Sequence, residues 1–519
     1  MKSWTQKHII LIFFFLLALP LVYRPIDGFH SWRQSDTAAV SKNFYQESLN
    51  ILFPKVDVRG NNVGPGGIVR MEFPLYQFII AIFYKISGTV WDGFGMLLSL
   101  FSSLLILWIT PKIFRVPRDS IIYFQIIMAS SPLFFAWSTK FMPQTFGLSL
   151  TLLGYYYYKR NADSPRIGYI MLSTLFFSTG VLVRPFYIFW CLPILLNFYL
   201  KLREKDIKKA SLVFMQGLFI IILFLSWYAL WGTYLTNNFD CNYVYPGSIL
   251  KFENYSLSCS LKFISTLSRT IFLNQMNFCF LAIFFIGLFK LKKNTLNLEL
   301  ICILCLYCII LPFIVGTTQI DYHPYYFLGI SPILAYVISQ GIQESLENKL
   351  LITSLFVFLI VGIIINLILT IPSKILMAGL FLPFIFYGIR FLCEFLHQRN
   401  KEVWCMALIF LTFLMTPVIS KIFLNSTPLR MALKELQPEV QEKVAPNDLV
   451  IITAKDHAFP LYVLKLKGYP ISPPQMEDIN ILQGLRTKGV KWVIPYNEDL
   501  NKYSLFKIDD YIRRLNQAL

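Results

Sequence analysis

The sequence predicts a polytopic α-helical membrane protein with a small α/β domain at its carboxyl-terminal end. Three observations support this fold class. Of the 519 residues, 56% are hydrophobic and only 15% are charged, a balance that no soluble globular domain of this length shows. About thirteen apolar runs are long enough to cross a bilayer. The basic residues gather between alternate runs, which is typical of cytoplasmic loops.

The predicted membrane module covers residues 1–424. No small-x-small cleavage site closes the first apolar run, so we expect this run to stay as the first span and not to act as a signal peptide. A helix that crosses a bilayer needs roughly 17 to 25 residues. The runs, of 15 to 23 residues, extend over 8–23, 93–110, 120–138, 141–158, 167–183, 185–200, 210–231, 276–290, 298–316, 324–341, 350–370, 374–396 and 403–424.

The distribution of basic residues predicts the topology. Clusters of Lys and Arg follow every second span, the first of them at Lys112, Arg115 and Arg118. By the positive-inside rule the amino terminus is cytoplasmic and the carboxyl-terminal tail is external. We therefore attribute the net charge of +18 to topology and not to nucleic-acid binding.

Two predicted external loops are long, 24–92 and 232–275. The first should hold an amphipathic helix from Ser31 to about Ser48, a glycine-rich crossing and a second helix from about Pro74 to Ile86. Ser31 and Gln34 fit a capping box. On this helix we expect Trp32, Val40 and Phe44 to lie against the membrane. Lys42 and Glu47 should face water.

Residues 425–519 turn polar after the last span and form the predicted external α/β domain. Runs typical of strands occur at 449–452 and 490–494, and runs typical of helices at 459–467 and 478–488.

Cys241 and Cys259 share the second external loop, where a disulfide and two free thiols both remain open.

Asp36 is the first candidate catalytic residue. Arg33 precedes it by three positions, so both side chains lie on one face of the predicted helix. A carboxylate beside a guanidinium stays ionised and suits a general base. The alternative is an ordinary surface ion pair.

Two further charged residues stand near predicted helix ends on the external side. Glu72 precedes Pro74, where it is either a charge that favours the helix amino terminus or a second acid of the site. Arg184 interrupts an apolar region; a charge at such a position is a functional candidate, and snorkelling to the interface is the alternative.

The segment 321–326, Asp-Tyr-His-Pro-Tyr-Tyr, marks the external start of a later span. Tyr325 and Tyr326 fit an aromatic belt, and Tyr322 and Tyr325 are also candidates for binding the donor. A lipid phosphate requires cationic donors, and we predict that His323 joins a set of arginines that could surround one, which are Arg33, Arg70 and Arg184.

Several motifs are absent from the sequence. It has no P-loop and no G-x-G-x-x-G between a strand and a helix, which argues against a nucleotide donor. H-E-x-x-H and G-x-S-x-G are also absent. No convincing set of metal ligands appears, so we predict no certain cofactor and leave a divalent metal open. We interpret Cys302, Cys305 and Cys308 as apolar packing residues.

Together, these residues resemble the GT-C glycosyltransferases, specifically the bacterial branch similar to protein O-mannosyltransferases and lipid A aminoarabinose transferases. The resemblance covers nearly the whole chain. It implies a bacterial inner-membrane enzyme that moves a sugar from a polyprenyl-phosphate donor to a lipid, glycan or protein acceptor on the outer face, with inversion. The small carboxyl-terminal domain would then be periplasmic.

The resemblance also implies roles for single residues. Asp36 matches the aspartate that acts as the base, and the segment Glu72 to Tyr76 matches the motif that ends in Pro-Leu-Tyr, which implies that Tyr76 contacts the donor. The chain departs from the family in two places: Ser35 stands where many relatives have a second acid, and Phe73 where a lysine is common. A transporter or flippase of an anionic lipid and a non-catalytic assembly factor of the cell envelope remain alternatives.

Overall fold

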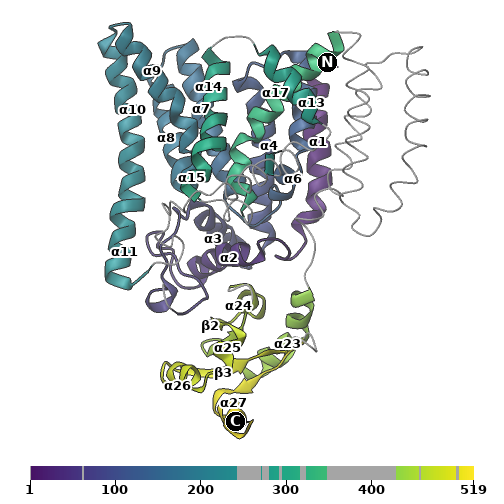
Figure 1. The fold of residues 1–519 in the computed structure, drawn as a ribbon, viewed down its shortest axis with the longest axis vertical. Helices are drawn as coiled ribbons and strands as arrows, with labels where there is room; N and C mark the ends of the chain where they lie inside the picture. Colours follow the sequence, from purple (N-terminus) through teal and green to yellow (C-terminus); the bar gives the residue numbers. More distant parts are fainter. Residues whose placement is uncertain are drawn as a thin grey trace, which may run out of the picture.

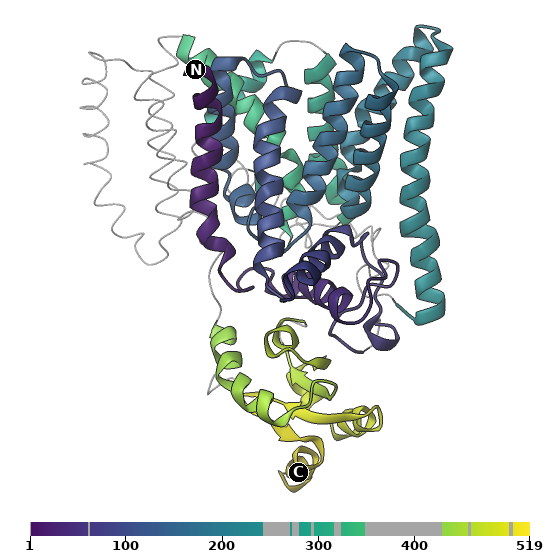
Figure 2. The ribbon, with the colours of Figure 1, turned by 180° about the vertical axis from the view of Figure 1, so that it is seen from behind.

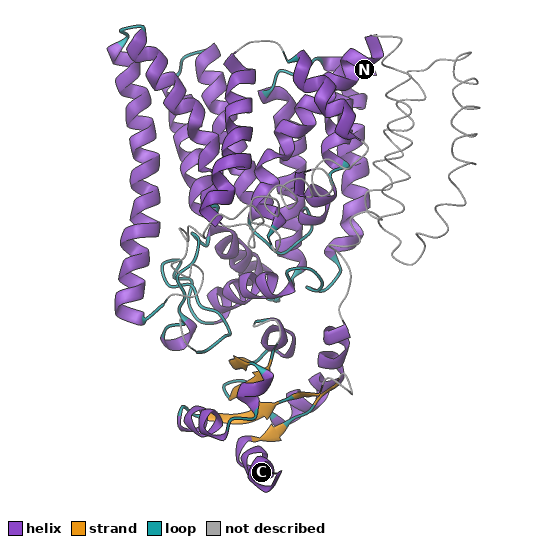
Figure 3. Ribbon diagram, viewed as in Figure 1, coloured by secondary structure: helices purple, strands orange, loops and turns teal. Residues whose placement is uncertain are grey.

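The computed structural model describes residues 2–60, 63–241, 270–271, 280–291, 295–315, 323–347, 428–454, 458–497 and 502–518. Most of these residues are helical (Figure 3). Long helices run side by side in one bundle, two shorter helices lie across one end of the bundle, and a small unit with a β-sheet lies beyond them (Figure 1). The view from behind shows the same three layers (Figure 2). The fold is therefore mainly helical, with strands near the carboxyl terminus.

Four described segments are long and apolar enough to span a membrane: Gly93–Ile113, Pro185–Arg203, Ile207–Phe239 and Pro324–Ser345. Shorter apolar helices flank them. Along Ile207–Phe239, Phe219, Ile222 and Leu230 are exposed, as expected for side chains that face lipid. The bundle helices are α1 (Lys2–Val22), α4 (Gly93–Ile113), α5 (Ile121–Ala129), α6 (Pro132–Trp137), α7 (Gln144–Asp163), α8 (Ile167–Val183), α9 (Leu192–Arg203), α10 (Ile207–Leu225), α11 (Gly232–Phe239), α13 (Leu281–Lys290), α14 (Thr295–Cys305), α15 (Leu311–Val315) and α17 (Ser331–Glu347).

The predicted spans agree with these helices at most described positions. The exception is 120–138, where the chain forms the two helices α5 and α6. Pro132 stands at the first position of α6, and the side chain of Ser131 caps this helix by accepting a hydrogen bond from the amide of Phe134. A proline there ends the preceding helix. The predicted spans 350–370, 374–396 and 403–424 lie outside the described residues.

The first external loop contains the two helices predicted for it, α2 (Ser31–Gln46) and α3 (Leu75–Ser87). The predicted capping box is wrong. The N-cap residue is His30, which has a left-handed backbone (φ 61°) and no side-chain capping bond. The side chain of Gln34 instead accepts a hydrogen bond from the amide of Phe141, 107 residues away.

The predicted membrane face and water face of α2 are also wrong in part. Val40 and Phe44 are buried as expected, but Lys42 is buried too and forms a 2.5 Å ion pair with Asp57. The glycine-rich crossing and the carboxyl-terminal unit cover the side of α2 that would otherwise face water (Figure 1). The helix is therefore enclosed along most of its length.

The carboxyl-terminal unit begins with α23 (Pro428–Lys443). Its four-stranded sheet has the order β2-β1-β3-β6, with parallel pairs except at the β3–β6 edge. Helices connect the strands, as the sequence predicts. The elements are β1 (Leu449–Thr453), α24 (Phe459–Leu464), β2 (Lys467–Ile471), α25 (Pro473–Met476), α26 (Ile479–Thr487), β3 (Val490–Ile494), β4 (Tyr496–Asn497), β5 (Lys502–Tyr503), β6 (Phe506–Lys507) and α27 (Ile508–Ala518).

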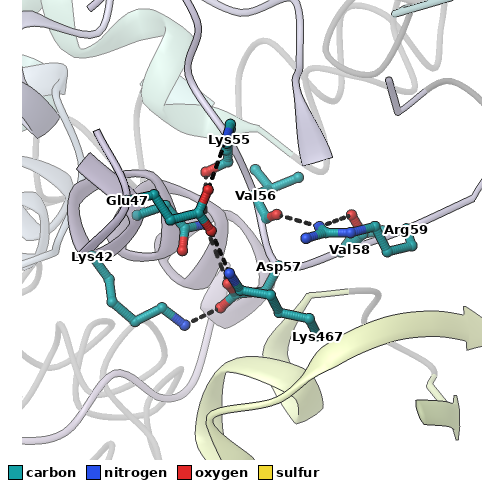
Figure 4. Close-up of polar contacts among 9 residues, drawn as sticks. Lys42, Glu47, Lys55, Val56, Asp57, Val58, Arg59 and Lys467 are labelled. Atoms are coloured by element: carbon teal, nitrogen blue, oxygen red, sulfur yellow. Dashed lines mark hydrogen bonds and ion pairs between the residues drawn. The ribbon is translucent and has the colours of Figure 1, made fainter. Parts of the chain in front are cut away.

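The first external loop joins this sheet at its β2 edge. The amide of Gly468 donates to the carbonyl of Asp57 (3.1 Å), and the amide of Arg59 donates to the carbonyl of Gly468 (2.7 Å). Val58 therefore pairs with Gly468 as a single-residue parallel bridge. Beside it, Glu47 at the end of α2 forms ion pairs with Lys55 and Lys467 (Figure 4). These contacts fix the sheet against the loop.

Candidate active site

The centre of the candidate site is a buried carboxylate that two arginines share. Glu72 Oε2 lies 2.6 Å from Arg33 Nη2, and Glu72 Oε1 lies 2.5 Å from Arg184 Nη1. All three side chains are at most 7% exposed. Two guanidinium groups and one carboxylate leave one positive charge in excess, an arrangement suited to an anion.

Local backbone contacts hold Glu72 in place. On one side of it, the indole of Trp227 donates to the carbonyl of Met71 (3.0 Å). On the other side, the amide of Phe73 donates to the carbonyl of Leu182 (3.1 Å), near the end of α8. Pro74 follows and caps α3. The loop is thus attached to two bundle helices next to the carboxylate.

Arg184 owes its position to the proline that follows it. A residue before proline is driven out of the α-helical region, and α8 ends at Val183 while Arg184 is extended (φ −145°, ψ 103°). The guanidinium carbon lies 5.4 Å from the centre of the Tyr325 ring, a cation–π distance. The absence of a side chain on Gly147 leaves room for the arginine stem, because a Cβ there would lie 3.0 Å from Arg184 Cγ.

Asp36 lies on α2, one turn beyond Arg33 and on the same face of the helix. It is 3% exposed. Two contacts from the turn between α6 and α7 hold the start of this helix: Gln34 accepts from the amide of Phe141 (3.1 Å), and Lys140 Nζ donates to the carbonyl of Phe29 (2.8 Å). The position of Asp36 therefore depends on the bundle as well as on α2.

An aromatic cluster forms one wall of the site. The rings of His30 and His323 stack with their centres 5.1 Å apart, and Tyr325 packs edge-on against His30 at 5.1 Å. Trp137 and Trp32 extend the wall at 5.8 Å from Tyr325 and 6.0 Å from His323 respectively. These residues come from the start of α2, from α6 and from the 3-10 segment that precedes α17, so the site joins distant parts of the chain.

Charges within the site shift the pKa values of two groups. Burial opposes ionisation of Glu72, but the charges of Arg33 and Arg184 outweigh it and lower the pKa of the carboxyl group. For His323, burial and then the same two arginines lower the pKa to about 4. Histidine is therefore neutral here at neutral pH. The role of His323 beside a lipid phosphate stays a prediction; in the structure its ring packs against His30 and Tyr325.

Of the predicted site residues, the structure brings together Arg33, Glu72, Arg184, His323 and Tyr325, and Asp36 lies one turn after Arg33 on α2. Arg70 lies elsewhere: it donates to the carbonyl of Tyr228 (2.9 Å) and so ties the loop to the long helix Ile207–Phe239. Tyr76 is fully buried and donates to the carbonyl of Gly95 (2.6 Å), which assigns it to the packing of α3 on α4. Tyr322 lies outside the described residues.

Sequence reasoning missed the roles of Lys140, Gln34 and His30. Lys140 is 3% exposed, and burial lowers the pKa of its ammonium group to about 7. With Gln34 it lines a cavity of about 160 Å³ that Arg24, Asp27 and Thr139 also border. The sequence does contain a signal for Lys140: it is a lysine between two predicted spans, and a charge at that depth is costly and therefore a functional candidate.

The cysteines and acids of the described residues give no support to a metal site. No group of three or more His, Cys, Asp and Glu side chains gathers in the part of the chain that the structure describes. Glu72 is engaged by two guanidinium groups, which repel a cation. Cys241 carries a free thiol that donates to the carbonyl of Ile68 (3.3 Å), and Cys259 lies outside the described residues.

Comparisons with known proteins agree with this arrangement. The family model for dolichyl-phosphate-mannose-protein mannosyltransferase matches residues 72–231, the segment from the central carboxylate to the long helix. Among curated proteins, no sequence matches the chain.

Solved structures share the fold over nearly the full length. ArnT from Cupriavidus metallidurans in the apo state is 12% identical, with 94% of this chain and 93% of that chain covered and a TM-score of 0.62. The same enzyme bound to undecaprenyl phosphate gives 11% identity, coverages of 94% and 93%, and a TM-score of 0.59. The oligosaccharyltransferase AglB from Archaeoglobus fulgidus, in complex with an inhibitory peptide and a dolichol-phosphate, is 12% identical. The match covers 94% of this chain and 69% of that chain, with a TM-score of 0.50.

The family match and the shared fold bear out the resemblance predicted from the sequence. ArnT and AglB share the fold over 94% of this chain, and the family model matches the sequence of residues 72–231. The chain therefore has the fold of ArnT and AglB, and its residues 72–231 match the family of dolichyl-phosphate-mannose-protein mannosyltransferases.

Proposed function

We propose that the protein transfers a sugar from a polyprenyl-phosphate donor to an acceptor hydroxyl or phosphate on the outer face of the membrane, with inversion and with Asp36 as the general base. The observation that carries this proposal is the pair of arginines on Glu72, one helical turn from Asp36. This arrangement supports an anion site next to a carboxylate base. ArnT and AglB, which share the fold, bind undecaprenyl phosphate and dolichol-phosphate.

The anion site would hold the donor phosphate. Arg33 and Arg184 are already oriented by Glu72, so they reach the phosphate without reorganising, which is the condition for strong electrostatic stabilisation. Glu72 acts by positioning the two guanidinium groups and does not take the proton. The neutral ring of His323 and the face of Tyr325 border the same space.

The chemical step is one displacement. Asp36 accepts the proton of the acceptor hydroxyl while the oxygen attacks the anomeric carbon from the face opposite the phosphate. The new bond from carbon to the acceptor oxygen forms as the bond to the phosphate oxygen breaks. The electron pair leaves with the polyprenyl phosphate, and Arg33 and Arg184 stabilise the negative charge that develops on it.

The same proposal includes the arrangement of the whole chain. Residues 1–424 form a transmembrane module of about thirteen spans with loop 24–92 carrying the site, and residues 425–519 form an external domain. In a bacterial cell the module lies in the inner membrane, with a cytoplasmic amino terminus and a periplasmic carboxyl-terminal domain. The four long apolar helices and the aligned bundle support this arrangement.

A transfer assay tests the function. Purified protein in lipid nanodiscs is incubated with radiolabelled polyprenyl-phosphate sugars and candidate lipid, glycan and protein acceptors. The proposal expects the label to move from the lipid donor to an acceptor. A flippase, the alternative, would move the intact labelled lipid between the leaflets of a vesicle and leave the sugar on its phosphate. That second result would overturn the proposed function.

A further inference from the structure

A second and larger cavity lies between the membrane bundle and the carboxyl-terminal unit. It encloses about 1280 Å³ and is open to solvent. One wall comes from the end of α1, from α2 and from the segment before α4; the other comes from α23 and from the segment that joins α24 to β2. We call it the interdomain cleft. None of the groups in the central site, Arg33, Glu72 and Arg184, lines it.

The interdomain cleft has an excess of positive charge. Two carboxylates, Glu47 and Asp92, line it; Glu47 is engaged by Lys55 and Lys467, and Asp92 accepts a hydrogen bond from Tyr462. Among the described residues, Arg24, Lys434 and Lys465 form no ion pair. The cationic residues that line the cleft in the described part of the chain are Arg24, Lys42, Arg430, Lys434, Lys465 and Lys467. A net cationic cleft with exposed lysines attracts an anion.

The remaining lining residues suit a saccharide. Tyr23 and Trp91 lie on one wall with ring centres 5.7 Å apart, and Tyr23 is 70% exposed. Aromatic faces present apolar surface on which a sugar ring can stack. Amide side chains, which both donate and accept hydrogen bonds, stand opposite them at Gln437, Gln441 and Asn447. Charge, aromatic surface and amides therefore occur together in one cleft.

Two structural elements are shared by the interdomain cleft and the surroundings of the candidate active site. Lys42 and Gln46 line the cleft on the same helix that carries Asp36; at 1.5 Å per residue, Lys42 lies about 9 Å along the helix axis from Asp36. Arg24 and Pro25 border both the cleft and the smaller cavity that reaches Gln34 and Lys140. The cleft is thus bordered by the helix that carries the proposed base, and the groups of the proposed donor site do not line it.

We propose that the interdomain cleft binds a phosphorylated saccharide, with the phosphate on Lys434, Lys465 and Arg24 and the sugar ring against Tyr23 and Trp91. The binding proposal rests only on the residues that line the cleft. The role of this saccharide as the acceptor rests on the proposed function. The anionic sugar is either free or carried on a lipid, and both sources present the same chemistry to the cleft.

Binding measurements on the full-length protein in nanodiscs test the site. The probe is a phosphorylated tetrasaccharide, compared with the same tetrasaccharide without phosphate, and the signal is the change in tryptophan fluorescence from Trp91. A third arm presents the phosphorylated saccharide on a lipid in the nanodisc. Lys434→Glu/Lys465→Glu should weaken binding of the phosphorylated probe at least tenfold. Lys502→Glu, an exposed lysine of the same unit outside the cleft, is the matched control and should leave binding unchanged.

The outcomes separate the site from the proposed function. Equal affinity for the two tetrasaccharides, or an equal effect of the cleft and control variants, overturns the site. Tighter binding of the free or of the lipid-carried form supports it and identifies the source. Because binding is measured without donor, a protein that binds the probe but transfers no sugar contradicts the proposed function and leaves the site standing.

Discussion

The buried carboxylate of Glu72 holds the guanidinium groups of two arginines. Arg33 and Arg184 approach it from α2 and from the end of α8, and all three side chains are nearly inaccessible to water. The sequence indicated each of these residues separately. It could not pair them, because Glu72 and Arg184 are 112 residues apart and only the packed bundle brings them together.

Replacement of Glu72 with glutamine should be strongly destabilising. Removing one partner leaves two buried guanidinium charges with less compensation, and the expected loss is about 3–5 kcal/mol in the free energy of unfolding. Thermal unfolding in nanodiscs measures the change. The control is Glu439→Gln, which breaks an exposed pair with Lys443 and should cost less than about 1 kcal/mol. Equal losses in the two variants would contradict the buried cluster.

The ring of His323 makes the stability depend on pH. Its folded-state pKa of about 4 lies below the ordinary value of 6.5, so between these values the unfolded chain binds a proton that the folded protein excludes. Stability is therefore lost as the pH falls from 6.5 to 4. In His323→Gln this loss should be smaller, while the two proteins should respond alike above pH 7. Parallel curves from pH 7 to 4 would show that the histidine is not buried as described.

Helix α2 illustrates where patterns within one element succeed and fail. Its extent follows from the sequence, since Ser31–Gln46 is close to the predicted range. Its capping does not. The Ser-x-x-Gln spacing is compatible with a capping box, but a glutamine side chain can also bond to a distant amide. Here Gln34 accepts a hydrogen bond from the amide of Phe141. The local spacing of residues shows which hydrogen bonds a side chain could form, and the packing of the folded chain determines which of them it does form.

Removal of the Gln34 side chain should affect catalysis through helix position. Gln34→Ala leaves the buried amide of Phe141 without its acceptor, at a cost of about 1–3 kcal/mol, and loosens the turn that precedes Asp36. We expect the transfer rate to fall more than donor affinity does. Gln46→Ala, at the exposed end of the same helix, should stay within about 0.5 kcal/mol of the unchanged protein. Loss of donor affinity without loss of rate would argue against this positioning role.

The helical bundle and the carboxyl-terminal sheet of the described residues were largely predictable, because long apolar runs and alternating patterns indicate helices and strands directly. The contact between the loop and the carboxyl-terminal sheet was not. It depends on a single-residue bridge at Val58 and Gly468, and on an ion pair between Glu47 and Lys467, 420 residues apart. No periodic pattern encodes such a contact. Gly468 is required at the bridge, since a Cβ there would lie 2.0 Å from the carbonyl oxygen of Val450.

Reversal of the charge at Lys467 should loosen this contact. Lys467→Glu places a carboxylate against Glu47, and hydrogen exchange at the amides of Arg59 and Gly468 should become several-fold faster, because both amides bond across the contact. Lys488→Glu, an exposed residue of the same unit, is the control. Unchanged exchange in Lys467→Glu would mean that the backbone bridge holds the sheet without help from the ion pair.

The most direct test of the proposed mechanism is the rate of sugar transfer by Asp36→Asn. Single-turnover transfer from a radiolabelled polyprenyl-phosphate sugar is compared with that of the unchanged protein, and donor binding is measured on the same samples. We expect the rate to fall by about 10²- to 10⁴-fold, the contribution of a general base, with donor binding retained because Arg33, Glu72 and Arg184 are intact. Transfer at the full rate by Asp36→Asn would remove Asp36 from the mechanism.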